Sequence, residues 1–242
     1  MGDVKLKLSG DRAVLVEFAQ EISPAVHRQV RSFCAAMERS SLPGVVEIVP
    51  AYCAVTVHYR PEEIRYEQLA GRLQGILRNL DAVEIPPAAV WEIPVFYGGE
   101  AGPDLEFVAR HSGLTAEEVI RRHAQPEYLV YMLGFTPGFP YLGGMDAAIA
   151  APRLTEPRVK IPAGSVGIAG QQTGVYPIAS PGGWQLIGRT PVKLYDPGRE
   201  KPVLLEAGDY VKFCPVDAAE YDRICQLEAA GQWTCRTWRK EG

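Results

Sequence analysis

Residues 160–191 read KIPAGSVGIAGQQTGVYPIASPGGWQLIGRTP, a stretch in which glycine or proline separates short apolar runs. The same punctuation extends over residues 134–198, which contain 12 glycines and 9 prolines in 65 positions. The runs between them, such as 166–169, 175–178 and 184–187, are rich in β-branched and aromatic residues, which favour strands. Short strands joined by frequent turns predict a compact β-barrel or sandwich.

Further elements are predicted on either side of this β-rich stretch. Strands are expected at 91–97 and 128–133, and a hairpin at 203–213. A helical insert lies between the first two strands and contains the capping box Thr115-Ala-Glu-Glu118. A last helix begins at Asp217, where Asp can cap the free backbone N–H groups of the first turn.

The first 82 residues have a different pattern. Strands are predicted at 13–18 and at 53–59, where apolar and polar side chains alternate. Ser23-Pro24 predicts a helix start, with Ser at the N-cap and Pro at the first helical position. A second helix is expected at 66–80 from the spacing of its leucines. These elements predict a small α+β domain.

A linker is predicted between the two patterns. Pro86-Pro87 disfavours helix and blocks central strand pairing, so the chain is expected to divide there. The predicted domains are an α+β domain at residues 1–82 and a β-rich domain at residues 83–242. The predicted fold class is therefore α+β.

Composition excludes several classes of protein. The net charge is −4, which does not favour nucleic acid or an anionic membrane surface. No apolar run is long enough for a membrane helix, and the N-terminus lacks the apolar core of a secretory signal. Five cysteines without a CxxC pair argue against a disulfide scaffold or a zinc ribbon. A reducing cytoplasm is the expected compartment.

The charges are unevenly distributed. Residues 1–82 are neutral overall, whereas residues 83–242 carry the entire net charge of −4. Within the second region, residues 157–195 contain Arg and Lys but neither Asp nor Glu. Such a cationic segment could hold a small anion, or its basic side chains could simply be solvated. Arg158 is a candidate for anion binding unless Glu156 pairs with it locally.

Standard catalytic motifs are not matched. Gly183–Thr190 nearly spells a phosphate-binding loop, but Arg189 replaces the required Lys and the residues between are typical of a strand. Gly164-Ser165 resembles part of a nucleophile elbow, but all four histidines lie upstream. His111 and His123 are expected at the surface of the helical insert. No catalytic residue and no metal ligand is assigned.

Four dense segments supply the candidate binding residues. Their glycines let a ligand approach the backbone, and their polar side chains supply orienting donors. Phe135, Pro137 and Leu142 are instead expected to shape turns or fill the barrel. The candidate substrate-binding residues are Arg153, Arg158, Gln172, Tyr176, Ser180 and Arg189, and the candidate site-shaping residues are Gly138, Phe139, Tyr141, Gly164, Ser165, Gly182, Gly183 and Trp184.

The same segments resemble the PxpB/KipI family, known as the B subunits of 5-oxoprolinase and also as allophanate hydrolase subunit 1 or kinase A inhibitor. The motifs that carry the resemblance are GFTPGFPYL, PAGSVGIAG, QTGVYP and SPGGWQLIGRTP, and it extends from Gly10 to Phe213. The tail at residues 232–242 lies outside it. The resemblance implies a small N-terminal α+β domain followed by a cyclophilin-like β-barrel.

The resemblance also implies a function. It implies a hydrolase complex in which this chain and subunits A and C open 5-oxo-L-proline to L-glutamate with ATP cleavage. Because the chain has neither a nucleophile–base pair nor a phosphate loop, the isolated chain is expected to be inactive. ATP with Mg would be shared with or held by the partner subunits. Two alternatives are an inhibitor that binds a sporulation histidine kinase, and a carboxyltransferase or allophanate hydrolase-like subunit, which would need a biotin carrier from a partner.

Overall fold

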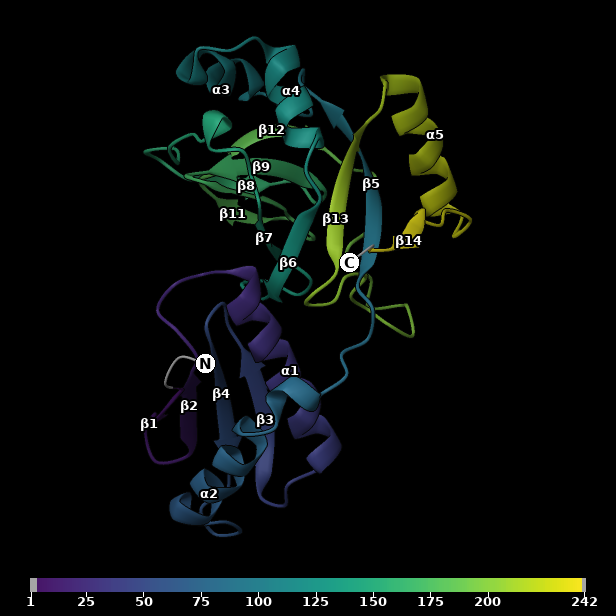
Figure 1. The fold of residues 1–242 in the computed structure, drawn as a ribbon. Coiled ribbons are helices and arrows are strands. Elements are labelled where there is room, and N and C mark those ends of the chain that lie inside the picture. The colour runs from purple at the N-terminus through teal and green to yellow at the C-terminus, as the bar shows by residue number, and fades with distance from the viewer. Residues whose placement is uncertain (1–3, 241–242) are drawn as a thin grey trace. The chain divides into compact units, whose positions relative to one another are not determined.

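The computed structural model describes residues 4–240, and the chain forms two compact units, residues 1–87 and 88–242. Figure 1 colours the first unit purple to blue and the second from blue-green to yellow. The first unit is an α+β layer structure, and the second is built on a nearly closed, barrel-like sheet. The α+β class predicted from the sequence is confirmed, and so is the barrel.

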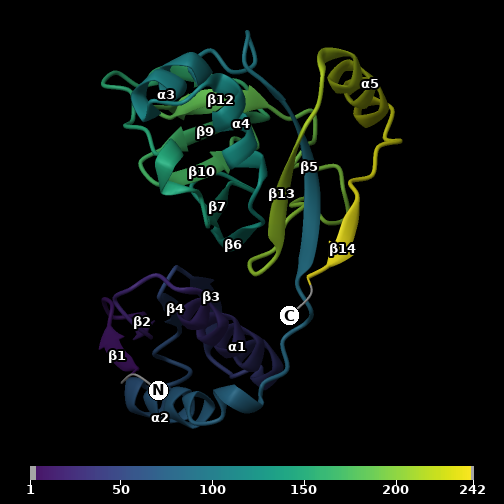
Figure 2. The ribbon, with the colours of Figure 1, turned by 45° about the horizontal axis from the view of Figure 1, so that its top comes forward.

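The first unit is an antiparallel sheet of four strands in the order β1-β2-β4-β3, with two helices on one face (Figures 1 and 2). Ser23 caps α1 by accepting a hydrogen bond from the Val26 N–H, and Pro24 is its first residue, as predicted. Valines of β2 and β4 pack against Phe33 of α1 and Leu69 of α2. The elements are β1 (Lys5–Leu8), β2 (Ala13–Glu17), α1 (Pro24–Ser40), β3 (Val45–Pro50), β4 (Ala54–Tyr59), α2 (Tyr66–Leu77) and η1 (Leu80–Ala82).

The second unit winds its main sheet into a barrel in the order β10-β9-β12-β5-β13-β6-β7, and β7 and β10 at the two ends lie side by side. Its apolar core is built from β5, β6, β9, β12 and β13. A separate pair, β8 and β11, forms a two-stranded sheet. The strands are β5 (Ala89–Tyr97), β6 (Tyr128–Leu133), β7 (Pro140–Gly143), β8 (Arg158–Ile161), β9 (Ser165–Ala169), β10 (Gln172–Val175), β11 (Ser180–Gly182), β12 (Gln185–Arg189), β13 (Tyr210–Pro215) and β14 (Thr237–Arg239).

Helices flank this barrel (Figure 2). The Thr115 hydroxyl accepts from the Glu118 N–H at 3.2 Å, and the Asp217 carboxylate accepts from the Glu220 N–H at 2.8 Å, so both predicted N-caps are confirmed. Helices α3 and α4 contact β12 and β13 respectively, and α5 contacts β5. The helices are α3 (Leu105–Ser112), α4 (Ala116–Ala124), η2 (Ala147–Ile149) and α5 (Ala218–Ala229).

The predicted hairpin at 203–213 is wrong. Only its second arm is a strand, β13, which runs parallel to β5 and antiparallel to β6. Val203 makes just an isolated bridge to Tyr195. The turn before β13 is held by Asp209, whose carboxylate accepts from the Trp91 indole and the Glu206 N–H. Contacts with distant strands therefore replace the local pairing that the pattern predicts.

Two other segments also differ from expectation. Strand β10 ends at Val175, so the predicted strand at 175–178 is wrong; Pro177 has no N–H with which to continue a ladder. The tail, for which the sequence indicates no role, adds β14 antiparallel to the first residues of β5. The near match to a phosphate loop is a strand, β12, as expected.

Candidate functional site

A small pocket is lined by residues of three strands and of the loops that connect them. Its volume is about 270 Å³, and we call it the aromatic pocket. Strands β7, β10 and β11 and the loops around them supply its walls. It is lined by Phe135, Phe139, Tyr141, Arg153, Gln172, Tyr176, Gly182, Gly183 and Trp184.

Packed aromatic rings form the floor of the pocket. Phe139 lies at the centre, with its ring centroid 5.4 Å from that of Tyr141 and 5.6 Å from those of Tyr176 and Trp184. All three contacts are edge-to-face, with interplanar angles of 66° to 86°. Phe139, Tyr176 and Trp184 are buried, so these rings form a rigid apolar surface.

Glycines leave the space that the rings occupy. A Cβ on Gly182 would lie 2.4 Å from the Tyr176 hydroxyl oxygen and 2.8 Å from Ile161 Cδ1. A Cβ on Gly174, in β10, would lie 3.2 Å from the Trp184 ring and 3.3 Å from that of Phe139. The small residues of these motifs therefore determine where the Tyr176 hydroxyl and the floor lie.

One wall is a tight loop between β6 and β7. Backbone hydrogen bonds from Gly134 to Phe139 and from Phe139 to Thr136 close the loop. Phe135 has a φ of +65°, which a bulky residue rarely adopts, and 68% of it is exposed. The expectation that Phe135 fills the barrel is wrong, whereas Leu142 is buried in the barrel core as expected. Positive φ at a bulky residue has no sequence signal, so only the structure places Phe135 at the pocket.

Tyr176 supplies a hydroxyl group to this pocket. Burial raises its pKa above the ordinary value, and the Trp184 backbone and the charges of Arg153 and Arg158 oppose that change. The hydroxyl therefore keeps a proton that it can donate to a ligand. Gln172 and Arg153 are the other polar residues of the lining.

Arg153 is the cation of the pocket. Its side chain is exposed, and it has no carboxylate within ion-pair distance among residues 4–240. Its charge nevertheless acts on the Tyr176 hydroxyl. No Asp or Glu lines the aromatic pocket in the described part of the chain. A small anion is therefore the ligand that this donor set favours.

Arg158 lies outside the pocket lining, and its surroundings differ from those expected. Its guanidinium donates to both carboxylate oxygens of Asp104, at 2.8 and 2.9 Å, and to the Trp184 carbonyl at 3.2 Å. Asp104 also accepts from the Leu186 N–H at 2.6 Å. We call this group the Asp104–Arg158 clamp. Arg158 therefore pairs with Asp104, which is distant in the sequence, and not with the neighbouring Glu156 that was the expected alternative to an anionic ligand.

The remaining candidates do not line the aromatic pocket. Ser165 is fully buried, and its hydroxyl and that of Ser180 have no hydrogen-bond partner in the described structure. Arg189 lies opposite Ser165 on β12, and its side chain lies close enough to Tyr221 of α5 to oppose the rise that burial causes in the pKa of that hydroxyl. A Cβ on Gly164 would lie 2.3 Å from the Thr190 carbonyl, so glycine is required by packing there. Gly138, with φ +78°, packs against Tyr195 at the other side of its loop.

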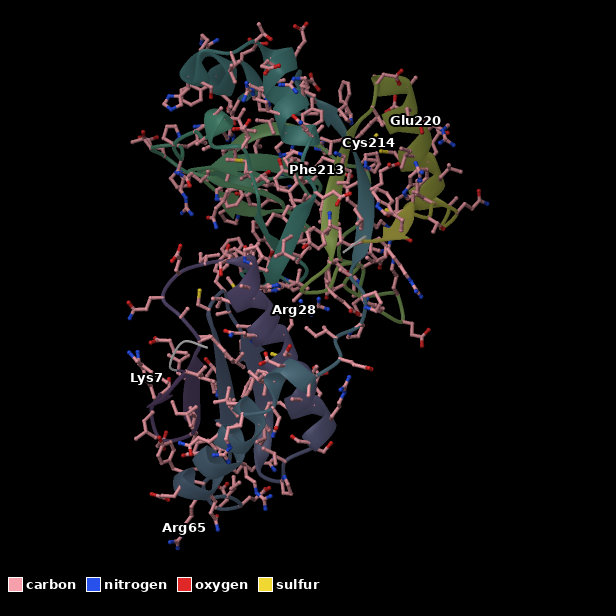
Figure 3. The ribbon with its side chains drawn as sticks, in the orientation of Figure 1. Lys7, Arg28, Arg65, Phe213, Cys214 and Glu220 are labelled. Atoms are coloured by element: carbon pink, nitrogen blue, oxygen red, sulfur yellow. The ribbon has the colours of Figure 1, made fainter. Side chains whose placement is uncertain are left out.

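His123 is buried, and the expectation that it lies at the surface is wrong. Its Nδ1 lies 2.8 Å from the Tyr97 hydroxyl, its Nε2 lies 2.7 Å from the Thr173 hydroxyl, and its ring stacks on Phe213 at 4.6 Å. Burial lowers its pKa to about 3, so the imidazole is neutral. It joins α4 to the sheet; Figure 3 labels Phe213 on β13. His111 is exposed, as expected.

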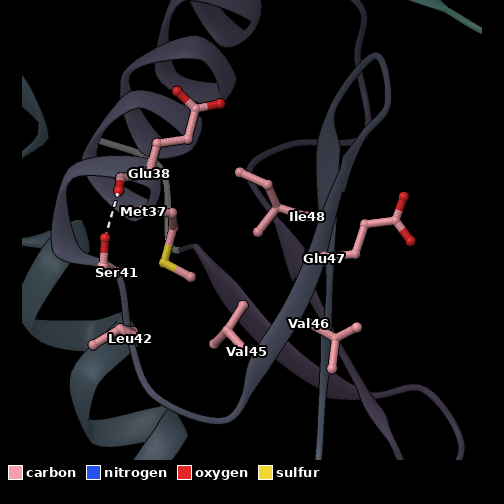
Figure 4. Close-up of a pocket in the computed structure, with 8 residues that line it drawn as sticks. All are labelled: Met37, Glu38, Ser41, Leu42, Val45, Val46, Glu47 and Ile48. Carbon is pink, nitrogen blue, oxygen red and sulfur yellow. Dashed lines mark hydrogen bonds between the residues drawn. The ribbon is translucent and has the colours of Figure 1, made fainter.

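A second cavity, of about 340 Å³, lies in the first unit between α1 and β3. Figure 4 shows Met37, Val45 and Ile48 lining it, with the carboxylates of Glu38 and Glu47 pointing away from them. The Ser41 hydroxyl donates to the Glu38 carbonyl rather than into the cavity. Because no polar groups converge on it from the described residues, this cavity lacks the means to orient a ligand.

Metal clusters and membrane spans were two further possibilities for the chain. No group of three His, Cys, Asp or Glu within residues 4–240 is arranged to hold a metal ion. No helix in that range is long and apolar enough to cross a bilayer. All five cysteines are free thiols.

Comparison with known proteins gives consistent matches. The family model of the carboxyltransferase domain, subdomains C and D, matches residues 4–205. The 5-oxoprolinase B subunit of Bacillus subtilis (strain 168) is 49% identical over 226 residues, which cover 88% of this chain and 92% of that protein.

Solved structures agree. The structure of TTHA0988 is 40% identical with a TM-score of 0.77, and the match covers 86% of this chain but 40% of that one, so this chain spans less than half of that protein. The Kluyveromyces lactis urea amidolyase has a TM-score of 0.78 at 21% identity, with 98% of this chain and 16% of that one covered, and shows the shared fold. The family match ends before β13, α5 and β14.

Proposed function

Because the chain belongs to the carboxyltransferase subdomain C and D family and to the 5-oxoprolinase members within it, we propose that it is the B subunit of an ATP-dependent 5-oxoprolinase. In this proposal the chain acts with subunits A and C to hydrolyse 5-oxo-L-proline to L-glutamate, with cleavage of ATP. The observation that carries the proposal is the aromatic pocket, which lies within the segment matched by the family model and, among the described residues, has donors but no acceptor carboxylates.

The pocket suits the proposed substrate. 5-Oxoproline is a small, nearly flat ring that carries a single carboxylate and a neutral lactam. The apolar floor of Phe139 and Trp184 can cover the ring, and Arg153 can pair with the carboxylate. The Tyr176 hydroxyl supplies a donor for the lactam carbonyl, whose oxygen gains negative charge as the amide is attacked.

ATP does not fit the donor set of this pocket. Among the described residues Arg153 is the only cation of its lining, no carboxylate is present there to hold Mg²⁺, and the nearest match to a phosphate loop is the strand β12. We therefore propose that ATP and Mg²⁺ are held by a partner subunit. Energy from ATP is needed because a five-membered lactam is a stable amide and a poor electrophile.

The isolated chain is proposed to lack activity. His123 is enclosed between Tyr97 and Thr173, and Ser165 is fully buried. Neither offers the exposed nucleophile and adjacent base that hydrolysis without a partner requires. The chain thus contributes the substrate-binding pocket, and the other subunits supply ATP and the reacting groups. Its five free thiols are consistent with the proposed cytoplasmic location.

The test is reconstitution. The chain would be co-expressed with subunits A and C, and ATP-dependent release of glutamate from 5-oxoproline would be measured for the complex and for each part. Activity of the complex and none of the single chain is the expected result. Robust turnover by the single chain would contradict the division of roles. A complex that releases no glutamate from 5-oxoproline, but carboxylates urea or an amide when a biotin carrier is added, would favour the carboxyltransferase alternative.

A further inference from the structure

The rings of the aromatic pocket pack against one another, which leaves few open ring faces for a cation. Aromatic faces attract ammonium groups when they are open. Here Phe139 meets Phe135, Tyr176 and Trp184 edge-to-face at centroid distances of 5.6 Å, and Tyr176 meets Trp184 at 6.2 Å. Each of these contacts sets the edge of one ring against a face of its neighbour, which leaves fewer ring faces open to a cation, and the floor offers apolar contact.

The charges around the floor are positive. Arg153 lines the pocket without a carboxylate partner in the described chain. The positive charges of Arg153 and Arg158 both act to lower the pKa of the Tyr176 hydroxyl. Arg158 is matched by Asp104, but the carboxylate of Asp104 is itself occupied by Arg158 and by the Leu186 N–H. Within residues 4–240 the lining thus has no carboxylate that could receive an ammonium group.

This donor set separates two kinds of small molecule. A lactam acid carries a carboxylate and an uncharged N–H. An amino acid of similar size carries an ammonium group as well, and burying that charge without a partner costs more than burying a neutral amide. Hydrolysis of a lactam acid converts the first kind into the second, because the C–N bond breaks, water supplies the oxygen, and the freed amine takes up a proton.

Resting on the proposed function, we propose that the aromatic pocket is a charge-selective site that binds the lactam acid and rejects its amino-acid product. In this proposal Arg153 pairs with the carboxylate, and the Tyr176 hydroxyl donates a hydrogen bond to the lactam carbonyl. The described lining has no acidic residue to pair with an ammonium group, which is therefore excluded. Opening of the ring therefore weakens binding at the moment the product forms. The selectivity belongs to this chain and requires neither ATP nor a partner.

Isothermal titration of the full chain tests the selectivity. The probes are 5-oxo-L-proline, cyclopentanecarboxylate, L-proline and L-glutamate, which vary the lactam and the ammonium group separately. We expect 5-oxoproline to bind at least tenfold more tightly than L-proline or L-glutamate, with cyclopentanecarboxylate between them. Equal affinity for L-proline and 5-oxoproline would overturn the proposal.

Variants assign the two roles. Arg153→Gln should weaken both ring acids by roughly tenfold, because it removes a charge-assisted hydrogen bond. Tyr176→Phe should weaken binding of 5-oxoproline but leave binding of cyclopentanecarboxylate unchanged, since only 5-oxoproline has a lactam carbonyl that can accept a hydrogen bond from the hydroxyl. Arg110→Gln, at an exposed arginine of α3, is the matched control and should bind as the parent does. Circular dichroism and Tm verify folding of each variant; a Tyr176→Phe variant that weakens both acids equally would refute the assigned role.

The same preparation separates this proposal from the proposed function. A reconstituted complex that turns over 5-oxoproline while the full chain binds none of it would overturn the pocket proposal and leave the function intact. A chain that selects 5-oxoproline but yields an inactive complex would support the pocket proposal and contradict the proposed function.

Discussion

The Asp104–Arg158 clamp and the aromatic pocket each contain an arginine from the same short segment, yet the two arginines have opposite surroundings. Arg158 is matched by a carboxylate that arrives from residue 104, and its side chain is 28% exposed. Arg153 faces solvent at a pocket whose described lining has no acidic residue. The comparison shows that two arginines five positions apart can differ in whether a carboxylate pairs with them, and that the fold decides this by which residues it brings close.

Breaking the clamp should have the largest effect on stability. Arg158→Ala leaves the Asp104 carboxylate, 14% exposed, without its cation, and removing one partner of such a pair costs about 3 kcal/mol. The expected fall in Tm is roughly 8 °C. Thermal and urea unfolding measure it. Arg158→Lys can keep the charge beside Asp104 but has no second nitrogen for the Trp184 carbonyl, so its stability should fall between those of Arg158→Ala and the parent. An unchanged Tm combined with lost activity of the complex would contradict the structural role and indicate that Arg158 binds substrate.

Filling the space beside Tyr176 should come next. Gly182→Ala places a Cβ 2.4 Å from the Tyr176 hydroxyl oxygen, so the ring or β11 must move. Such overpacking costs about 2 kcal/mol, and 5-oxoproline binding should be lost with it. Gly75→Ala is a matched control, because a Cβ there meets nothing within 4 Å. Binding that survives Gly182→Ala would show that the ligand does not depend on the position of the hydroxyl.

His123 is a third titratable residue to set beside the two arginines, because it is buried and carries no charge. Its pKa is about 3 in the folded chain and 6.5 when unperturbed, so the unfolded chain alone takes up a proton between these values. Stability is therefore complete above pH 6.5 and falls as the pH drops toward 3, by about 1.4 kcal/mol per pH unit. Urea midpoints from pH 7 to 5 measure the slope. It should persist in His111→Gln and diminish in His123→Gln; equal slopes in both would refute the assignment.

Changing the pocket arginine should leave stability nearly untouched. Arg153 is exposed and makes no ion pair within the described chain, so Arg153→Gln should alter the free energy of unfolding by less than about 0.5 kcal/mol. The measurement is urea unfolding alongside Arg158→Ala. A large loss of stability would mean that Arg153 is structural too, and the contrast between the two regions would disappear.

The linker prediction concerns the smallest effect. Residues 83–88 have no regular structure and precede β5, and we propose that the units before and after them are separable domains. Limited proteolysis should cut within residues 82–88 and leave two folded fragments, identified by mass spectrometry. Cleavage confined to the termini or to residues 134–198 would indicate one cooperative unit.

Features that depend on neighbours in sequence were predictable. The N-caps at Ser23, Thr115 and Asp217 involve a side chain and a backbone N–H three residues away, and all three are present. Strand β12 was distinguished from a phosphate loop by its own residues. Tyr176, Trp184 and Gly182, which were grouped from the sequence because their motifs combine ring, donor and glycine within a short span, all line the aromatic pocket.

What the amino-acid sequence determined by itself is the class of fold, its punctuation into short strands, and the set of residues from which a site could be built. Which of those residues meet was decided only by the tertiary structure. Asp104 pairs with Arg158 across 54 positions, and His123 reaches Thr173 across 50. A hydrogen bond or ion pair depends on distance in space, and closure of the barrel sets that distance for residues whose separation along the chain carries no signal of it.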